Sequence, residues 1–238
     1  MKVIPAIDIM ENKVVRLVKG DPKNKTIYSN DPVDTAKKWE KQGADMLHLV
    51  DLDATLGRGA NLDLVKKIAH EVSIPVQVAG GLRTEGMIEN VLQFASKAVL
   101  GTIAFKDPKS LQEISKKFGK DRIIISADQL QGKIVISGWT ENTGVELVSG
   151  IENFVGLGYS EFLLTSVDRD GTLQGPDLNS LTKACRIQNA KIIASGGISN
   201  LQDTINVKRC GAYAVILGKA LYDGKISIQE VQVQHDSD

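Results

Sequence analysis

Two short stretches, Ala79-Gly80-Gly81-Leu82-Arg83 and Ser195-Gly196-Gly197-Ile198-Ser199, decide the fold of this chain. Each follows a run of apolar residues that is typical of a buried strand, and each precedes a segment with helical periodicity. A Gly-Gly pair between a strand and a helix exposes backbone N–H groups beside the positive end of the helix, which suits a phosphate dianion. Two such loops predict a substrate that carries a phosphate at each end.

The second stretch repeats the first at half the length of the chain. Gly81 and Gly197 lie 116 positions apart (197 − 81), and Asp53-Ala54-Thr55-Leu56 returns as Asp170-Gly171-Thr172-Leu173, 117 positions later (170 − 53). The other matched pairs are Gly101 with Gly218, at 117 (218 − 101), and Asp8 with Asp128, at 120 (128 − 8). Turn residues are common and match by chance, but here the order of strand, turn and helix repeats with them. The pattern therefore indicates an internal duplication.

The rhythm of the chain predicts one parallel (β/α)8 barrel over residues 1–238. Eight apolar strands alternate with amphipathic helices at about 30 residues per unit, which is typical of this architecture. We expect half-barrels at about 1–120 and 121–225, with a hairpin arm at 133–137 and a helix over 144–157. The polar, aperiodic segment 20–30 is expected to form a mobile loop or lid, and the tail from Ser227 onward is expected to fray.

Composition excludes several classes of protein. The 238 residues are 42% hydrophobic and 24% charged, as in ordinary globular domains, and 29 basic residues balance 29 acidic ones, which argues against nucleic-acid binding. Cys185 and Cys210 lack metal-site spacing and the three histidines are scattered, so we expect no metal. No apolar run approaches the ~20 residues of a membrane span. Because Met1-Lys2 leads directly into a strand, we expect no signal peptide and a cytoplasmic location.

Chemistry in such barrels occurs where the strands end at their carboxyl sides. Asp8 and Asp128 end the first and fifth strands, opposite each other around the ring, and such a pair suits general acid–base catalysis. Strand-terminal aspartates also cap turns, but two at duplicated positions between phosphate loops favour catalysis. The sequence does not show which is the acid and which the base.

Further candidates follow the fifth and sixth strands. Asp170, just beyond Thr165, either donates a proton or orients a substrate hydroxyl, whereas Asp170-Gly171 is equally a turn signal. Trp139 either stacks on a planar base or packs in the core. Arg83 is placed to clamp a phosphate or carboxamide, or lies on the surface. The predicted catalytic residues are Asp8, Asp128, Thr165 and Asp170, and the predicted substrate- and phosphate-binding residues are Gly80, Gly81, Arg83, Gly101, Thr102, Trp139, Gly171, Gly196, Gly197, Gly218 and Lys219.

The chain resembles a known family over residues 3 to about 224. The motifs that carry the resemblance are Val3-Ile4-Pro5-Ala6-Ile7-Asp8, Val50-Asp51-Leu52-Asp53, Ala79-Gly80-Gly81-Leu82-Arg83, Asp168-Arg169-Asp170-Gly171-Thr172-Leu173 with Gly175-Pro176, Ala194-Ser195-Gly196-Gly197-Ile198-Ser199 and Gly218-Lys219-Ala220-Leu221-Tyr222. Together they are similar to those of the phosphoribosylformimino-aminoimidazole carboxamide ribotide isomerases of histidine biosynthesis. Departures from the usual pattern are Ala79, Leu82, Ala54-Thr55 and Ala127-Asp128-Gln129-Leu130.

The resemblance implies an Amadori rearrangement of an aminoaldose to an aminoketose, on a bis-phosphorylated ribonucleotide and without metal or organic cofactor. It implies that Asp8 is the proton acceptor and Asp128 the proton donor. Thr165 and Asp170 match the family's strand-six Thr and Asp, and some members use that Asp as the acid. We expect a small-molecule substrate as the partner and a monomer.

Three alternatives to the isomerase stay open. The sister barrel, the cyclase subunit of imidazole glycerol phosphate synthase, shares both aspartates, but Pro5-Ala6-Ile7-Asp8 and Ser137-Gly138-Trp139-Thr140-Glu141 favour the isomerase. A bifunctional isomerase that also accepts phosphoribosylanthranilate would differ in loop shape. A barrel that binds phosphosugars without turnover is the third, and the intact aspartates speak against it.

Overall fold

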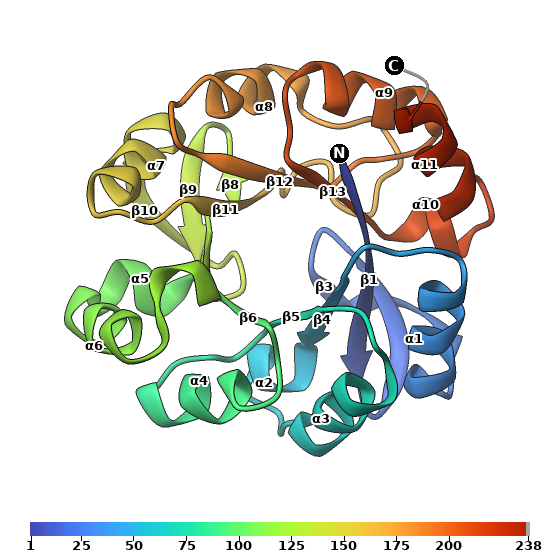
Figure 1. Cartoon of the computed structure of the whole chain (residues 1–238), viewed down its shortest axis with the longest axis horizontal. Coiled ribbons are helices and arrows are strands. Elements are labelled where there is room, and N and C mark those ends of the chain that lie inside the picture. Colours follow the sequence, from blue (N-terminus) through green and yellow to red (C-terminus); the bar gives the residue numbers. More distant parts are fainter. Residues whose placement is uncertain (237–238) are drawn as a thin grey trace.

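The computed structural model describes residues 1–236 as a closed barrel of parallel strands with helices around it (Figure 1). The β13 strand pairs in parallel with β1, with Lys2 opposite Ala214, and this pairing closes the ring. The predicted (β/α)8 barrel is therefore confirmed. In order around the ring, the strands are β1 (Lys2–Met10), β4 (Leu47–Asp51), β5 (Val76–Ala79), β6 (Lys97–Leu100), β7 (Ile123–Ser126), β11 (Glu161–Thr165), β12 (Lys191–Ser195) and β13 (Ala214–Leu217).

Helices cover the outside of the barrel (Figure 1). The long ones are α1 (Pro32–Lys41), α3 (Leu62–Glu71), α4 (Glu85–Leu92), α6 (Pro108–Phe118), α7 (Leu147–Gly156), α8 (Leu178–Cys185), α9 (Leu201–Arg209) and α11 (Ile228–Asp236). Short helices α2 (Leu52–Leu56), α5 (Thr102–Lys106) and α10 (Lys219–Tyr222) follow β4, β6 and β13, and a 3-10 turn η1 (Lys120–Arg122) precedes β7. The start of α1 shows the local cause, because Asp31 accepts a hydrogen bond from the Asp34 N–H and Pro32 occupies the first turn.

Two apolar clusters pack against the barrel strands, one inside the ring and one outside it. The inner cluster is formed by Ile4, Ala6, Met46, Val99, Ile124, Leu163, Ile193, Ala214 and Ile216. A larger cluster packs between the strands and the helices, with Leu47, Ile68 and Phe162 fully buried in it. The barrel is thus a packed core and not a pore, so a ligand can enter only at an end.

The segment 20–30, expected to be a mobile loop, is instead a strand. The β3 strand (Asp21–Ser29) pairs antiparallel with β2 (Lys13–Val18), which itself pairs antiparallel with β1. Lys19 and Gly20 both have positive φ, 50° and 71°, as a two-residue hairpin turn requires. Because β3 is an edge strand held by backbone hydrogen bonds, its polar side chains show no buried face, and the pattern misled the prediction.

The helix predicted over 144–157 begins only at Leu147. Residues Glu141–Glu146 form β10, which pairs antiparallel with β9 (Lys133–Ile136), and β9 pairs with β8 (Gln129–Leu130). Gly144 has a φ of +76°, outside the helical region. The hairpin arm at 133–137 is confirmed, but it belongs to a separate three-stranded sheet that follows β7.

The C-terminal segment is a helix over most of its length. Ser227 and Glu230 exchange hydrogen bonds, with the Ser227 N–H 2.9 Å from Glu230 Oε2 and the Glu230 N–H 3.2 Å from Ser227 Oγ. Ile228 and Val231 are fully buried, so α11 packs on the barrel. The expectation of fraying from Ser227 is therefore wrong as far as Asp236, whereas Ser237 and Asp238 lie outside the described residues. Among residues 1–236, no helix is long and apolar enough to cross a membrane.

Candidate active site

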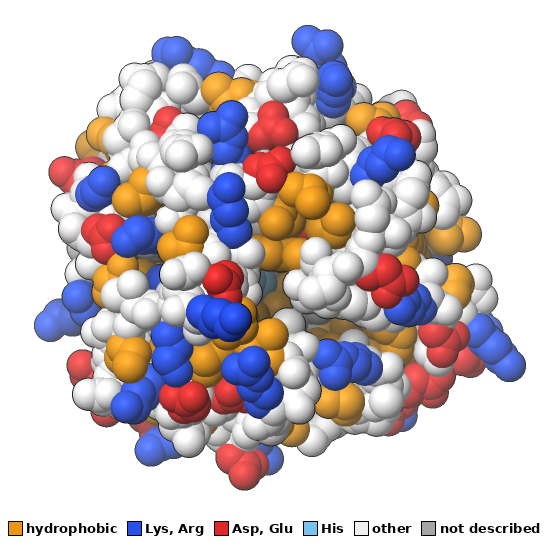
Figure 2. Space-filling model, turned by 180° about the vertical axis from the view of Figure 1, so that it is seen from behind, with side chains coloured by type: hydrophobic (Ala, Val, Ile, Leu, Met, Phe, Trp, Pro, Cys, Tyr) orange, Lys and Arg blue, Asp and Glu red, His pale blue; other side chains and the backbone are white. Residues whose placement is uncertain are grey.

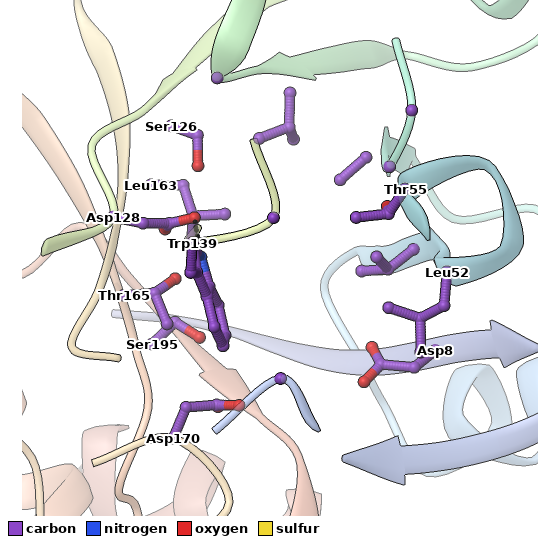
Figure 3. Close-up of a pocket in the computed structure, with 18 of the residues that line it drawn as sticks. Asp8, Leu52, Thr55, Ser126, Asp128, Trp139, Leu163, Thr165, Asp170 and Ser195 are labelled. Carbon is purple, nitrogen blue, oxygen red and sulfur yellow. Dashed lines mark hydrogen bonds between the residues drawn. The ribbon is translucent and has the colours of Figure 1, made fainter. Parts of the chain in front are cut away.

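A cavity of about 220 Å³ lies where the barrel strands end. Figure 2 shows this face of the molecule, hollowed near its centre, with hydrophobic, basic and acidic side chains around the opening. In the close-up of Figure 3, Asp8 points into the cavity from one side, and Asp128, Thr165 and Asp170 lie across from it. Side chains from strands far apart in the sequence therefore line one cavity.

Arg16 joins two of the predicted carboxylates. Its Nη1 is 2.9 Å from Oδ2 of Asp8, and its Nη2 is 3.8 Å from Oδ1 of Asp170. Only 9% of Arg16 is exposed, because β2 carries it under the mouth beside β1. Arg16 was not among the predicted site residues, although a lone arginine inside the apolar run 14–18 is a signal that could have identified it.

Burial and the neighbouring charges bring the pKa of Asp8 close to neutral pH. Burial raises the pKa of Asp8 to about 6, while the Arg16 charge pulls it down and Asp170 pushes it up. Burial likewise raises the pKa of Asp170, against the effect of Arg16. Two buried carboxyl groups that share one guanidinium are suited to hold different protonation states near neutral pH.

Asp128 stands beside Trp139 on the opposite wall. The indole Nε1 donates to Asp128 Oδ2 at 2.8 Å, and the half-buried ring lines the cavity between Asp128 and Asp170 (Figure 3). Burial raises the pKa of Asp128, whereas the hydrogen bond from Trp139 and the nearby hydroxyls of Thr165 and Ser126 lower it. Trp139 is thus at the mouth and not in the core between strands and helices.

His48 is a second residue of the cavity that sequence analysis missed. It points inward from β4, is 5% exposed, and its Nδ1 lies 2.9 Å from Nε2 of the fully buried Gln77. Burial lowers the pKa of His48 to about 3, and the nearby Arg16 charge adds to this, so the ring stays neutral. The internal repeat of the sequence could have identified His48, because it lies 117 positions before Thr165 (165 − 48).

The first glycine loop forms one wall of the cavity. Gly80 and Gly81 have φ of 98° and 68°, and a Cβ on Gly81 would collide with Ala54. Glycine is therefore needed here for close packing as well as for exposed N–H groups. Arg83 lines the same wall, and its Nη2 donates to the Thr55 carbonyl at 2.6 Å. Gly101 and Thr102, from the end of β6 and the start of α5, complete it.

The second glycine loop encloses a smaller recess next to the main cavity. Its predicted members are Gly171, Gly196, Gly197, Gly218 and Lys219, and Arg16 and Asp170 reach it from the main cavity. Gly196 and Gly197 have φ of 90° and 85°, and a Cβ on Gly197 would collide with the Gly175 carbonyl. The structure thus gathers the predicted site residues in these two adjoining spaces.

Two further aspartates near the mouth, Asp51 and Asp53, accept hydrogen bonds that fix the backbone around them. Asp51 accepts from the backbone N–H and from Nδ2 of Asn61, at 2.6 and 2.8 Å, and caps α2 through Ala54. Asp53 accepts from Asn61 Nδ2 at 2.8 Å and from the Glu11 N–H at 2.7 Å. These contacts tie α2 to the turn between β1 and β2.

Within residues 1–236, no three His, Cys, Asp or Glu side chains are grouped as they would be to hold a metal ion. The ionisable side chains that line the cavity are instead one histidine, two arginines, of which Arg16 is buried, and three carboxyl groups. Such a set supports proton transfer between side chains and a bound small molecule.

The fold and the site define a (β/α)8 barrel with its ionisable groups at the carboxyl ends of the strands, where barrel enzymes carry their catalytic residues. Comparison with known proteins shows to which family of barrels the chain belongs. Residues 2–227 match the histidine biosynthesis protein family, and the chain belongs to that family.

Relatives from several organisms carry one name, 1-(5-phosphoribosyl)-5-((5-phosphoribosylamino)methylideneamino) imidazole-4-carboxamide isomerase. The protein of that name from Nitrosopumilus maritimus is 60% identical over 232 residues, covering 98% of both chains. That from Cenarchaeum symbiosum is 55% identical, covering 96% of this chain and 98% of its own. That from Methanocaldococcus jannaschii is 37% identical, covering 97% of both. The chain is thus similar to these isomerases over nearly its whole length.

Proposed function

We propose that this protein is the isomerase of histidine biosynthesis that converts a bis-phosphorylated aminoaldose into its aminoketose. The observation that carries the proposal is the placement of Asp8 across one cavity from Asp128 and Asp170, with a glycine loop at either side. The relatives are named for a substrate with two phosphoribosyl groups, and two glycine loops suit two phosphates. The elongated molecule would then lie with its sugar carbons between the carboxyl groups.

The reaction needs one acid and one base. The acid protonates the furanose ring oxygen as the bond from C1 to that oxygen breaks, which leaves a protonated imine at C1. The base then removes the proton from C2, and the electron pair of the C–H bond moves to form the enolamine. Tautomerisation of the enolamine gives the ketone at C2 and the amine at C1, so atoms and electrons balance without a redox partner.

Asp8 is assigned as the base. Near neutral pH a carboxyl group whose pKa is about 6 is mostly ionised, and it is basic enough to accept a carbon-bound proton. Arg16, 2.9 Å away, stabilises the ionised form before the reaction and turns the carboxylate toward the cavity. Once Asp8 takes the proton, the guanidinium still has Asp170 as a partner.

The acid is Asp128 or Asp170, since burial raises the pKa of both. Asp128 is held by the indole of Trp139, and Asp170 by Arg16, so either is aligned by a second side chain. Thr165 lies beside Asp128 at the end of β11 and is assigned to orient it. Arg83 and Lys219 supply one cation to each phosphate loop.

We infer that a monomer is the catalytic unit, because one chain supplies the three carboxyl groups and both glycine loops of the proposed site. Sedimentation at micromolar concentration should give the mass of one 25.8 kDa chain. We further propose a cytoplasmic location, in keeping with membership of the histidine biosynthesis protein family.

The decisive experiment is turnover of the aminoaldose by the purified protein, followed by absorbance. Isomerisation without added metal supports the proposal. Ring closure that depends on ammonia would identify a cyclase instead, and binding without turnover in either assay would leave a phosphosugar-binding barrel. A crystal soaked with sulfate should show anions at Gly81 and at Gly197, and anions elsewhere would contradict the substrate orientation.

A further inference from the structure

Three side chains form a closed hydrogen-bonded triangle at the rim of the second glycine recess. Lys219 Nζ is 2.9 Å from Asp223 Oδ2 and donates to Tyr28 Oη at 3.3 Å, and the Tyr28 hydroxyl donates to Asp223 Oδ1 at 2.6 Å. Lys219 and Asp223 belong to α10 and its end, whereas Tyr28 comes from β3, 191 positions earlier in the chain. A distant segment therefore fixes the direction of the ammonium group.

We propose that Tyr28 and Asp223 position the ammonium of Lys219 for a phosphate group of the substrate, and that Tyr28 thereby links the β2–β3 hairpin to phosphate binding. The inference rests on the proposed function, because it assigns a phosphate to the recess that Lys219 lines. It treats Tyr28 as a positioning residue, since Tyr28 acts through Lys219.

The hydrogen bonds that Lys219 makes leave one of its N–H donors for a ligand. An ammonium group has three N–H donors, and within residues 1–236 two of them are directed at Asp223 and Tyr28. Contacts on two sides restrict the rotation of a long, flexible side chain, so the third donor needs less ordering when an anion binds.

Tyr28 itself packs against other aromatic side chains. Its ring stacks on Tyr222 with centroids 4.9 Å apart, and Tyr222 packs edge-on against Trp39 at 5.4 Å. The Tyr222 hydroxyl donates to the Ala6 carbonyl of β1 at 2.9 Å, two residues before Asp8. The aromatic stack thus connects the triangle to the strand that carries the proposed base.

The tip of the same hairpin contacts the backbone of one proposed acid and the indole that holds the other. The Lys19 N–H donates to the Asp170 carbonyl at 3.1 Å. At Gly20 the chain passes so close to Trp139 that a Cβ there would lie 2.8 Å from the indole ring. One hairpin therefore contacts the Asp170 loop and Trp139 at its tip, and Lys219 through Tyr28.

The first half of the barrel has no such triangle at the equivalent positions. Thr102 takes the place of Lys219 (219 − 102 is 117), and Lys106 takes that of Asp223 (223 − 106 is 117). Lys106 pairs with Glu141 at 2.5 Å, away from the glycine loop. The triangle is thus specific to the second recess, and its effect should be confined to one of the two phosphates.

The test is a double-mutant cycle between Tyr28→Phe and Lys219→Met, read by calorimetric titration with inorganic phosphate and by steady-state kinetics. Tyr28→Phe alone should weaken one phosphate-binding event by about fivefold and raise KM to a similar extent, with kcat within about twofold of the parent. In the Lys219→Met background, Tyr28→Phe should change neither quantity further. Tyr213→Phe, which removes a hydroxyl near Lys2 at the opposite end of the barrel, is the matched control and should change neither.

Two results would overturn the inference. One is unchanged phosphate binding in Tyr28→Phe, and the other is an equal loss with and without Lys219. A thermal melt of each variant separates loss of fold from loss of binding. Phosphate binding does not require turnover. Absent coupling with full isomerase activity therefore refutes this inference alone, whereas intact coupling without isomerase activity refutes the proposed function alone.

Discussion

The two halves of the barrel place matching residues in different surroundings. Asp53 and Asp170 occupy the same position of the repeat, yet Asp53 accepts hydrogen bonds from Asn61 and from the Glu11 backbone. Asp170 instead faces the buried guanidinium of Arg16. Matched positions of the sequence repeat therefore both carry a carboxyl group, and its neighbours decide whether the group holds a turn or titrates.

Other matched positions of the repeat around the mouth also carry different residues. His48 in the first half corresponds to Thr165 in the second, and both face the cavity with different chemistry. Thr102 corresponds to Lys219, so the second loop has an ammonium group where the first has a hydroxyl. We propose that the halves arose by duplication and that an elongated substrate with two unlike ends favoured their divergence.

The largest expected effect comes from Asp8, the base assigned to the first half. Asp8→Asn keeps the shape of the side chain but removes its basicity, so kcat should fall by about 10²–10⁴-fold. Substrate affinity should stay within about tenfold, since the phosphate loops are untouched. Steady-state kinetics with a binding titration measures both, and a variant that keeps most of its kcat would remove Asp8 from the mechanism.

The acid is assigned by comparing carboxyl groups within the repeat. Asp128→Asn and Asp170→Asn should both lower kcat, and the larger loss identifies the proton donor. Asp53→Asn is the matched control, because it alters the counterpart of Asp170 without touching the cavity wall. It should cost about 1 kcal/mol in the free energy of unfolding, from weakened hydrogen bonds, with kcat unchanged. A kcat loss in Asp53→Asn comparable to that in Asp170→Asn would contradict the contrast between the halves.

The next largest effect is expected in the pH dependence of kcat/KM. Because burial raises the pKa of Asp8 to about 6, the base is protonated below that pH, and kcat/KM should fall about tenfold per unit as the pH drops further. The same shift affects stability with a defined sign. Between about pH 4 and 6 the folded protein holds a proton on Asp8 that the unfolded chain has released, so this group lowers the free energy of unfolding as the pH rises.

Urea unfolding at pH 4.5 and pH 7 measures that contribution, and Asp8→Asn should remove it. A kcat/KM profile that stays flat from pH 7 to pH 5 would exclude Asp8 as the titrating base. If Asp8→Asn kept the full pH dependence of the free energy of unfolding, another group would be its cause.

The smallest effects are expected from the glycine loops. Gly81→Ala and Gly197→Ala each place a Cβ against neighbouring backbone or side chain at positive φ. Each should lower the free energy of unfolding by about 2 kcal/mol and weaken phosphate binding in its own half. Gly57→Ala is the control, since its φ is +67° but the space beside it is open, and about 1 kcal/mol is expected there. Equal losses in all three variants would show that the tight packing at Gly81 and Gly197 contributes nothing.

Local signals in the sequence were enough to predict the barrel. The run 123–125 is apolar on both faces and predicts a strand covered on both sides, and Asp31-Pro32 predicts the start of a helix. The strand-terminal positions of Asp8 and Asp128 then predicted which end of the barrel carries ionisable groups. The edge strand β3 has mostly polar side chains without an alternating apolar pattern, so no such signal exists there and the prediction was wrong.

What the sequence by itself determined is thus the barrel, the end of it that carries the ionisable groups and most of the residues that line the cavity there. Only the tertiary structure decided that Arg16 lies between Asp8 and Asp170, that His48 stays neutral above Gln77, and that Tyr28 reaches Lys219. Periodicity and turn residues act over a few neighbours along the chain and can be read from it. Desolvation and charge pairing depend on groups brought together from distant strands, and these set the protonation states at the mouth.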